Sequence, residues 1–307
     1  MKRFITILLP TASLFASVDT TFFIDSNNKS LLIDISKRFD FFSKNISINT
    51  EAVAKIAKSS KANITTLSLE YYPFDNSLLS FGRVKLDLDL MQGSFDGAYF
   101  TYINNNLQAR AFYFKHYLLL KEELYKNKTL KGLYGLSFDY SFKHLNISNT
   151  TFKNIGLYSY SNINLNSSIA TLGYSKLYYK SNKYKEKANI FYIDFDLTKF
   201  NYTLYYAKNY KNALNKVFNY GSINSINPAI YYSLNSPYST VKLMELSVQK
   251  ENLYFSASIG QKEDKTHKKI ITAFELGVDK NSYSISLDGY AGDQKKISLL
   301  FKYRIGK

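Results

Sequence analysis

Apolar and polar side chains alternate one by one over much of this 307-residue chain. The segment from Gly82 to Leu90 shows this most clearly, because valine or leucine occupies every second position and charged residues stand between them. Side chains alternate sides along a strand, so this segment is a strand with one apolar and one ionic face. Similar runs of six to nine residues recur at 67–72, 107–114, 134–140, 191–197, 253–259, 283–288 and 297–305, and a tilted membrane strand needs ~9–11 residues.

The connections between these runs alternate in length. Short connections fall at 197–200, 250–252 and 279–281, and long ones at 208–237 and 261–267. Outer-membrane barrels have short periplasmic turns and long outer loops. The pattern therefore predicts an all-β chain, a closed antiparallel transmembrane β-barrel of about 16 strands, in a range of ~14–18. It would extend from about residue 30 to residue 305, with the connection 208–237 outside the cell.

The apolar face of each strand is expected to form the lipid-facing belt. The residues assigned to it are Val84, Leu86, Leu88, Leu253, Phe255, Ile259, Ile297, Leu299 and Phe301. Two segments leave alternatives open. Residues 50–58 suit a short helix, part of a loop or a poor strand, and residues 143–167 suit two strands or one strand with a long turn.

The N-terminus predicts export. Met1, Lys2 and Arg3 precede an apolar run and then small residues through Ser17, which is the pattern of a signal peptide cleaved after Ala16. The alternative is a buried N-terminal strand. The predicted organisation is a signal peptide at 1–16 and a single barrel domain at 17–307. No later stretch approaches the ~18 apolar residues of a spanning helix, so a membrane location would require a barrel.

Composition narrows the chemistry. The chain has no cysteine, which excludes disulfides and thiolate metal sites. Its three histidines lack the spacing of a zinc hydrolase, and no phosphate-binding or nucleophile-elbow motif occurs. His144, Asn146 and Ser148 have the residue types of a Ser-His-Asn phospholipase. Because no motif of such an enzyme surrounds them, a structural role as polar residues is the better interpretation. We expect no enzyme activity, no cofactor and no metal.

The charge points to anionic partners. Lysine and arginine number 40 against 24 acidic residues, for a net charge of +16, which falls to +14 without Lys2 and Arg3. No nucleic-acid motif accompanies this charge, and export makes such a partner unsuitable. The expected partners are outer-membrane lipid, lipopolysaccharide and small hydrophilic solutes. The choice between a monomer and a homo-oligomer stays open.

A family resemblance supports the barrel. The Gly-Arg strand at Gly82, the run of leucines and the following segment GSFDGAYF resemble the Opr-type (OprD-like) outer-membrane porins, over about Phe81–Phe114. The resemblance implies a porin in the bacterial outer membrane, with the loop after this strand near the constriction of the pore. Asp87 and Asp89 would otherwise suggest a glycosidase pair, but their place beside Arg83 and Lys85 favours lumen-wall charges.

The leading hypothesis is a porin for passive diffusion of small hydrophilic solutes, with a weak preference for anions. The predicted pore-lining and constriction residues are Arg83, Lys85, Asp87, Asp89, Asp96 and Arg110. A second hypothesis is a non-conducting outer-membrane barrel that acts as an adhesin or surface scaffold through the connection 208–237. A third is a soluble exported β-sandwich or β-helix.

Overall fold

The structure is a computed structural model, which describes residues 17–25, 29–41, 45–56, 61–88, 91–121, 124–197, 200–210, 230, 234, 238–280, 283–292 and 295–305. The predicted signal peptide and most of the connection 208–237 lie outside these residues. In the described part of the chain, no helix has the length and hydrophobicity needed to cross a bilayer.

The elements are β1 (Ser17–Asp25), β2 (Lys29–Phe41), β3 (Ile46–Ile56), β4 (Lys61–Tyr71), β5 (Ser77–Leu88), β6 (Met91–Asn104), β7 (Leu107–Lys121), β8 (Leu124–Phe142), β9 (Leu145–Lys153), β10 (Leu157–Asn166), β11 (Ala170–Lys180), β12 (Lys185–Leu197), β13 (Phe200–Asn209), β14 (Thr240–Lys250), β15 (Leu253–Glu263), β16 (Lys268–Lys280), β17 (Tyr283–Ala291) and β18 (Lys295–Ile305).

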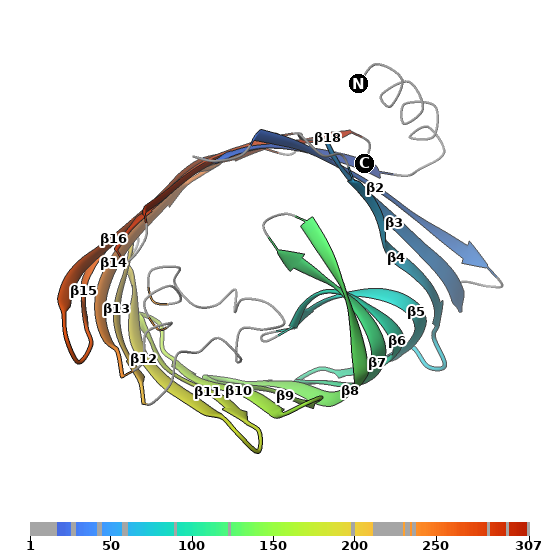
Figure 1. Cartoon of the computed structure of the whole chain (residues 1–307), viewed down its shortest axis with the longest axis horizontal. Helices are drawn as coiled ribbons and strands as arrows, with labels where there is room; N and C mark the ends of the chain where they lie inside the picture. Colours follow the sequence, from blue (N-terminus) through green and yellow to red (C-terminus); the bar gives the residue numbers. More distant parts are fainter. Residues whose placement is uncertain are drawn as a thin grey trace.

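These 18 described strands form one antiparallel ring. Each strand pairs with its neighbour in sequence, and β18 pairs with β1, so no strand is left as an edge (Figure 1). The antiparallel barrel is confirmed. The number of strands is at the upper end of the predicted range and two above its central value.

Three local predictions are resolved. The barrel begins at Ser17 and not near residue 30, because β1 pairs with both β2 and β18. Residues 50–56 belong to β3, so the helix is wrong for this segment, whose alternating positions pair with β2 and β4. Residues 143–167 hold two strands, β9 and β10, joined by a short turn.

The outward face of the later strands is apolar, as predicted. On β15, Leu253, Phe255 and Ile259 are exposed, whereas Ser258 between them is buried. Ile297 and Leu299 on β18 are also exposed, and the side chain of Phe301 lies outside the described set. A surface of this kind is the reverse of a soluble protein's, because large apolar side chains cover the outside of the barrel.

The turn between β15 and β16 is held by one carboxylate. Asp264 accepts hydrogen bonds from the backbone N–H groups of Thr266 and His267 and from the hydroxyl of Thr266, all at 2.9–3.0 Å. These donors stabilise the charged form and lower the pKa of Asp264 to about 2. Because the folded pKa lies below the unfolded one, the carboxylate stabilises the turn at neutral pH, and this contribution is lost as the pH falls from about 4 towards 2.

We therefore expect the side-chain carboxyl of Asp264 to titrate near pH 2 by carbon NMR of the folded barrel in micelles. Thr266→Val removes the hydroxyl donor and keeps both N–H donors, so it should raise this pKa only part of the way. A carboxyl that titrates near 4 in the unchanged protein would show that the turn is not formed in solution.

Candidate functional site: the interior of the barrel

Four strands leave the wall and fold into the interior. The parts of β5 and β6 from 83 to 96, and of β7 and β8 from 115 to 131, are here called the inner corner. In Figure 1 the ends of β7 and β8 cross the inside of the ring. The pairing of β4 with β5 ends at Arg83, whereas β4 continues along β3 to Lys61, so β5 departs from the wall at this point.

Glycines and bulges mark the line along which the corner bends. Gly82 has φ +109°, Gly132 has φ +84°, and the register shifts after Asp96 in β6 and after Phe114 in β7. Gly82 pairs with Gly97, which pairs with Phe114, so these irregularities lie side by side across the strands. Because a bulge bends its strand, an aligned row of them folds the sheet as a unit.

The bend reverses the prediction for the apolar face of β5. Val84, Leu86 and Leu88 were expected to face lipid, but only 5–8% of each is exposed. They belong to the buried apolar cluster that contains Phe95 and Phe114, whose ring centroids are 5.1 Å apart. The alternation is correct, but beyond Gly82 the strand is no longer part of the wall, so its apolar face turns to this cluster.

Arg83 and Asp96 are brought together as a cross-strand ion pair at the bend. The Nε and Nη2 groups of Arg83 donate to the two carboxylate oxygens of Asp96 at 2.5 and 2.8 Å, and Nη1 donates to the carbonyl oxygen of Ile64 at 2.9 Å. Such a two-pronged pair is geometrically specific. The contact with Ile64 ties the corner to β4 where the strand pairing has ended.

Lys85 is turned to the inner wall and reaches β3. Its Nζ lies 2.5 Å from a carboxylate oxygen of Glu51, which also accepts a hydrogen bond from Thr66 at 2.9 Å. Between the corner and β2–β4 lies a cavity of about 550 Å³, with Glu51, Glu70 and Lys85 among its lining residues. The rest of that lining is mainly polar and includes Ser36, Arg38, Ser68 and Ser80.

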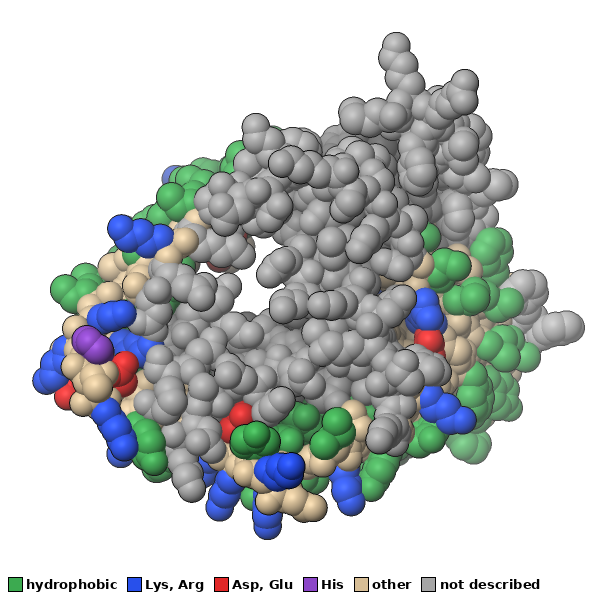
Figure 2. All heavy atoms as spheres, viewed as in Figure 1, with side chains coloured by type: hydrophobic (Ala, Val, Ile, Leu, Met, Phe, Trp, Pro, Cys, Tyr) green, Lys and Arg blue, Asp and Glu red, His purple; other side chains and the backbone are tan. Residues whose placement is uncertain are grey.

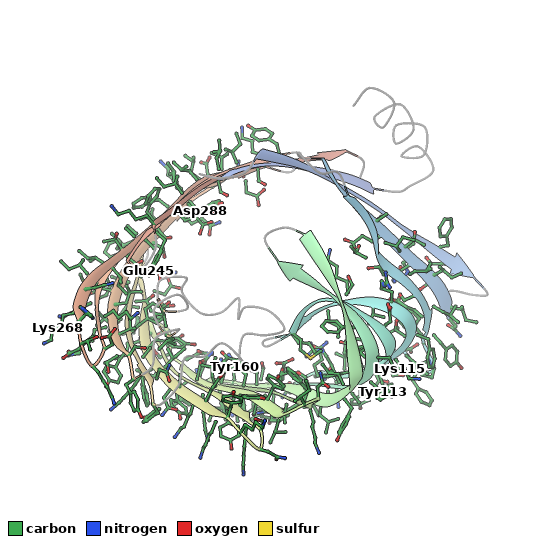
Figure 3. The ribbon with its side chains drawn as sticks, in the orientation of Figure 1. Tyr113, Lys115, Tyr160, Glu245, Lys268 and Asp288 are labelled. Atoms are coloured by element: carbon green, nitrogen blue, oxygen red, sulfur yellow. The ribbon has the colours of Figure 1, made fainter. Side chains whose placement is uncertain are left out.

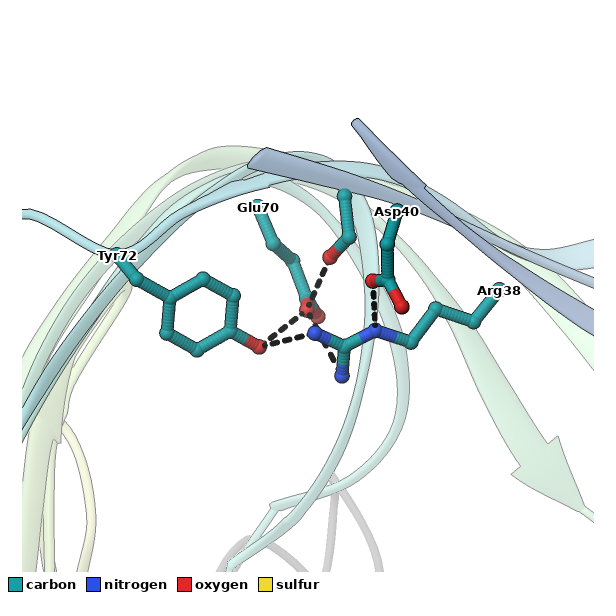
Figure 4. A network of polar contacts seen from close by, with 5 residues as sticks. Arg38, Asp40, Glu70 and Tyr72 are labelled. Carbon is teal, nitrogen blue, oxygen red and sulfur yellow. Dashed lines mark hydrogen bonds and ion pairs between the residues drawn. The ribbon is translucent and has the colours of Figure 1, made fainter. Parts of the chain in front are cut away.

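A second charged network lies on the same wall. Arg38 donates to Asp40 at 2.8 Å and to the hydroxyl of Tyr72 at 3.1 Å (Figure 4). That hydroxyl donates to Glu70 at 2.9 Å, and Ser47 also donates to Glu70. The network links β2, β3 and the end of β4, and it fixes the direction of the Arg38 guanidinium. Arg38, Glu51 and Glu70 are interior residues that the sequence prediction missed.

Arg110 also lies in the interior, but it forms an ion pair separate from that of Arg83 and Asp96. Its Nη1 lies 2.5 Å from Asp139, and its partner across the strands is Ser137, which is buried against Thr150. Arg110 therefore does not join Arg83 and Asp96. The side chain of Asp87 and the whole of Asp89 lie outside the described residues, so their predicted places are not assigned.

The opposite wall carries carboxylates. Glu275 on β16 and Asp288 on β17 are paired partners, and the row through Asp194, Thr203 and Glu245 runs across β12–β14. Figure 3 shows Glu245 and Asp288 on the inner side of the wall, whereas Lys268 projects outward. The described interior thus has arginines in ion pairs with aspartates on one side. On the other side it has a series of carboxylates. No group of three metal-ligating side chains occurs among the described residues.

Comparison with known proteins agrees with this geometry. No protein-family model and no curated protein sequence matches the chain. Solved structures do, at low identity. The OpdF porin of Pseudomonas aeruginosa in complex with glucuronate has a TM-score of 0.75 and 10% identity, with 94% of this chain and 97% of that chain covered. The structure of OpdK from the same organism with vanillate has a TM-score of 0.73 and 10% identity, with 94% of this chain and 97% of that chain covered. The outer-membrane protein OprD of Pseudomonas aeruginosa has a TM-score of 0.71 and 13% identity, with 94% of this chain and 92% of that chain covered. The resemblance to OprD-like porins is thereby confirmed for the fold.

Proposed function

We propose that this chain is an outer-membrane porin, a water-filled channel for passive diffusion of small hydrophilic solutes. The observation that carries the proposal is the inverted distribution of side chains. Large apolar residues cover the outside of a closed barrel, while ionised residues of both signs line its inside. That distribution suits a wall with lipid outside and water within. The shared fold with OprD-like porins supports it.

We further propose that the segment 82–97 lines the narrowest part of the pore. It belongs to the inner corner, which reduces the free cross-section of the ring (Figure 1). Lys85 of this segment meets the opposite lining of the cavity through Glu51. A fixed charge at a constriction acts on a passing solute at short range, where screening by salt is weakest.

Selectivity is proposed to be weakly anionic. The net charge without Lys2 and Arg3 is +14, and the solved complexes of OpdF and OpdK hold glucuronate and vanillate, which are both carboxylates. Arg38, Lys85 and Arg110 supply interior positive charge. The carboxylates of β12–β17 act in the opposite direction, which is why the preference is weak and not strong.

Planar-bilayer recording of the refolded chain in a salt gradient tests conduction and selectivity together. Arg83→Ala with Lys85→Ala should remove the anion preference, because residues 83–96 of the corner then carry only acidic charges. The matched variant, Glu245→Gln with Asp288→Asn, removes two charges of the other sign from the opposite wall and should increase it. Unchanged reversal potentials in both variants would place the selectivity determinant elsewhere.

The same recordings separate the alternatives. A folded barrel that inserts but never conducts would favour the adhesin or scaffold hypothesis. A chain that stays folded and monodisperse without detergent would favour a soluble exported protein.

A further inference from the structure

The outer surface of β10–β14 is layered by side-chain type. The pairing places Lys176, Asn189 and Lys208 in one row across three strands, with Tyr178 and Lys187 in the row nearer the long connection. The next row towards the middle of the barrel is aromatic on β11–β13, with Tyr174, Phe191 and Tyr206, and continues as Ile163 on β10 and Lys242 on β14. The row beyond it is aliphatic and consists of Leu165, Leu172, Ile193, Leu204 and Met244.

These rows face away from the lumen. The residues that alternate with them, Leu177, Ala188, Ile190 and Ala207, are at most 2% exposed. In Figure 2 lysine and arginine side chains project from the outer rim on this side of the ring. A charged row, an aromatic row and an aliphatic row in that order match the boundary between water and a bilayer.

The basic row has no acidic counterpart. Among the described outward-facing positions of β10–β14 there is no Asp or Glu in these three rows, and no ion pair joins Lys176, Lys187 or Lys208 to a described carboxylate. Lys187 and Lys208 converge instead on Tyr210, with their Nζ atoms 4.7 and 5.5 Å from its ring centroid. The hydroxyl of Tyr210 accepts a hydrogen bond from Asn189 at 3.1 Å. The ammonium groups of Lys187 and Lys208 are thus gathered over one ring, and no carboxylate in the described part of the chain pairs with them.

An apolar groove lies directly below the lysines. It has a volume of about 500 Å³ and is lined by Ile163, Leu172, Phe191, Ile193 and Leu204, with Gly173 among them. It crosses β10 to β13, and at ~4.8 Å per strand this is about 15 Å, wider than a single acyl chain. The arrangement fits a ligand with phosphates at one end and several hydrocarbon chains at the other.

We propose that this surface, Lys176, Lys187 and Lys208 above the groove of β10–β13, binds lipopolysaccharide through its lipid A part. The lysines would pair with the lipid A phosphates, and the acyl chains would lie in the groove. The site lies at the end of the barrel that carries the connection between β13 and β14, which the proposed topology places in the outer leaflet. The inference rests on the proposed outer-membrane location but not on conduction.

The test is binding of purified lipid A to the delipidated full chain in detergent, measured by native mass spectrometry. The unchanged protein should retain one lipid A. The triple variant Lys176→Gln, Lys187→Gln and Lys208→Gln should lose about tenfold or more in affinity. The matched control, Lys143→Gln, Lys250→Gln and Lys280→Gln, removes the same charge at the short-turn end and should bind as the unchanged protein does. Leu204→Trp, which fills the groove and leaves the lysines, should also weaken binding.

Three results would overturn the proposal. The first is equal loss in the two triple variants, the second is unchanged binding by Leu204→Trp, and the third is equally tight binding of phosphatidylglycerol. Conductance of the same variants keeps this inference apart from the porin proposal. All the substituted side chains lie outside the lumen, so a variant that loses lipid A should still conduct as the unchanged protein does. A chain that binds lipid A and never conducts would end the porin proposal and leave this one standing.

Discussion

Replacing Gly82 with alanine should release the inner corner and raise the single-channel conductance. The φ of +109° at this position is strained for any residue with a side chain, and a Cβ there would collide with the carbonyl oxygen of Leu67 on β4. The backbone strain alone costs roughly 1–3 kcal/mol. Because the neighbouring atom is backbone, it cannot rotate away, so the bend itself must yield.

Two other glycines on the bend separate strain from collision. Gly132 has φ +84°, but a Cβ there would meet only the Tyr113 ring at 3.6 Å, so Gly132→Ala tests strain alone. Gly97 is not in the left-handed region, but its Cβ would collide with the carbonyl oxygen of Tyr113, so Gly97→Ala tests collision alone. Both should raise the conductance by less than Gly82→Ala does. If all three variants conduct as the unchanged protein does, the corner does not restrict the pore.

Phe95→Ala should be the most destabilising single truncation of the corner. Phe95 is fully buried in the apolar cluster that holds the corner, where it packs against Phe114. Deleting a buried phenylalanine ring costs about 3–5 kcal/mol through lost burial and the cavity left behind. The measurement is urea unfolding of the barrel in phospholipid vesicles.

Phe100→Ala is the matched control, because Phe100 lies on the same strand and is 39% exposed on the outer surface. It should cost about 1 kcal/mol or less, since no interior cavity forms. Equal losses at the two positions would mean that the corner is not packed inside the barrel in the membrane.

The sequence was sufficient for the wall and insufficient for the corner. Leu253, Phe255 and Ile259 were assigned to the outer face from alternation alone, and alternation is enough wherever a strand stays in the ring. Val84, Leu86 and Leu88 have the same period, but alternation gives only which residues share a face. It does not say what that face meets. The available signal was Gly82 with Gly93 and Gly97, which mark a break in the wall only once the pairing of β4 with β5 is known.

The interior charged residues could also be predicted only in part. Arg83, Asp96 and Arg110 were identified as charged positions between apolar ones, and the structure finds each of them in an ion pair. The partner of Lys85 was not predictable, because it is Glu51 on β3, 34 positions earlier, and β3 is not a neighbour of β5 in the ring. Only the inward fold of β5 brings these two strands together. Arg38 was missed because its role depends on Tyr72 and Glu70 of a later strand.

The pairing of β18 with β1 has a consequence for the time course of folding. Every other strand pair joins neighbours in the sequence, with the longest connection between β13 and β14, whereas Val18 pairs with Ile305 at the other end of the chain. Bringing distant segments together costs more entropy, although the cost rises only slowly with length. We therefore expect the seam between β1 and β18 to close last. Until it does, two unpaired edges remain open, each able to capture a strand of another molecule. We expect the chain to be most prone to aggregate in the interval before closure, while those two edges are open.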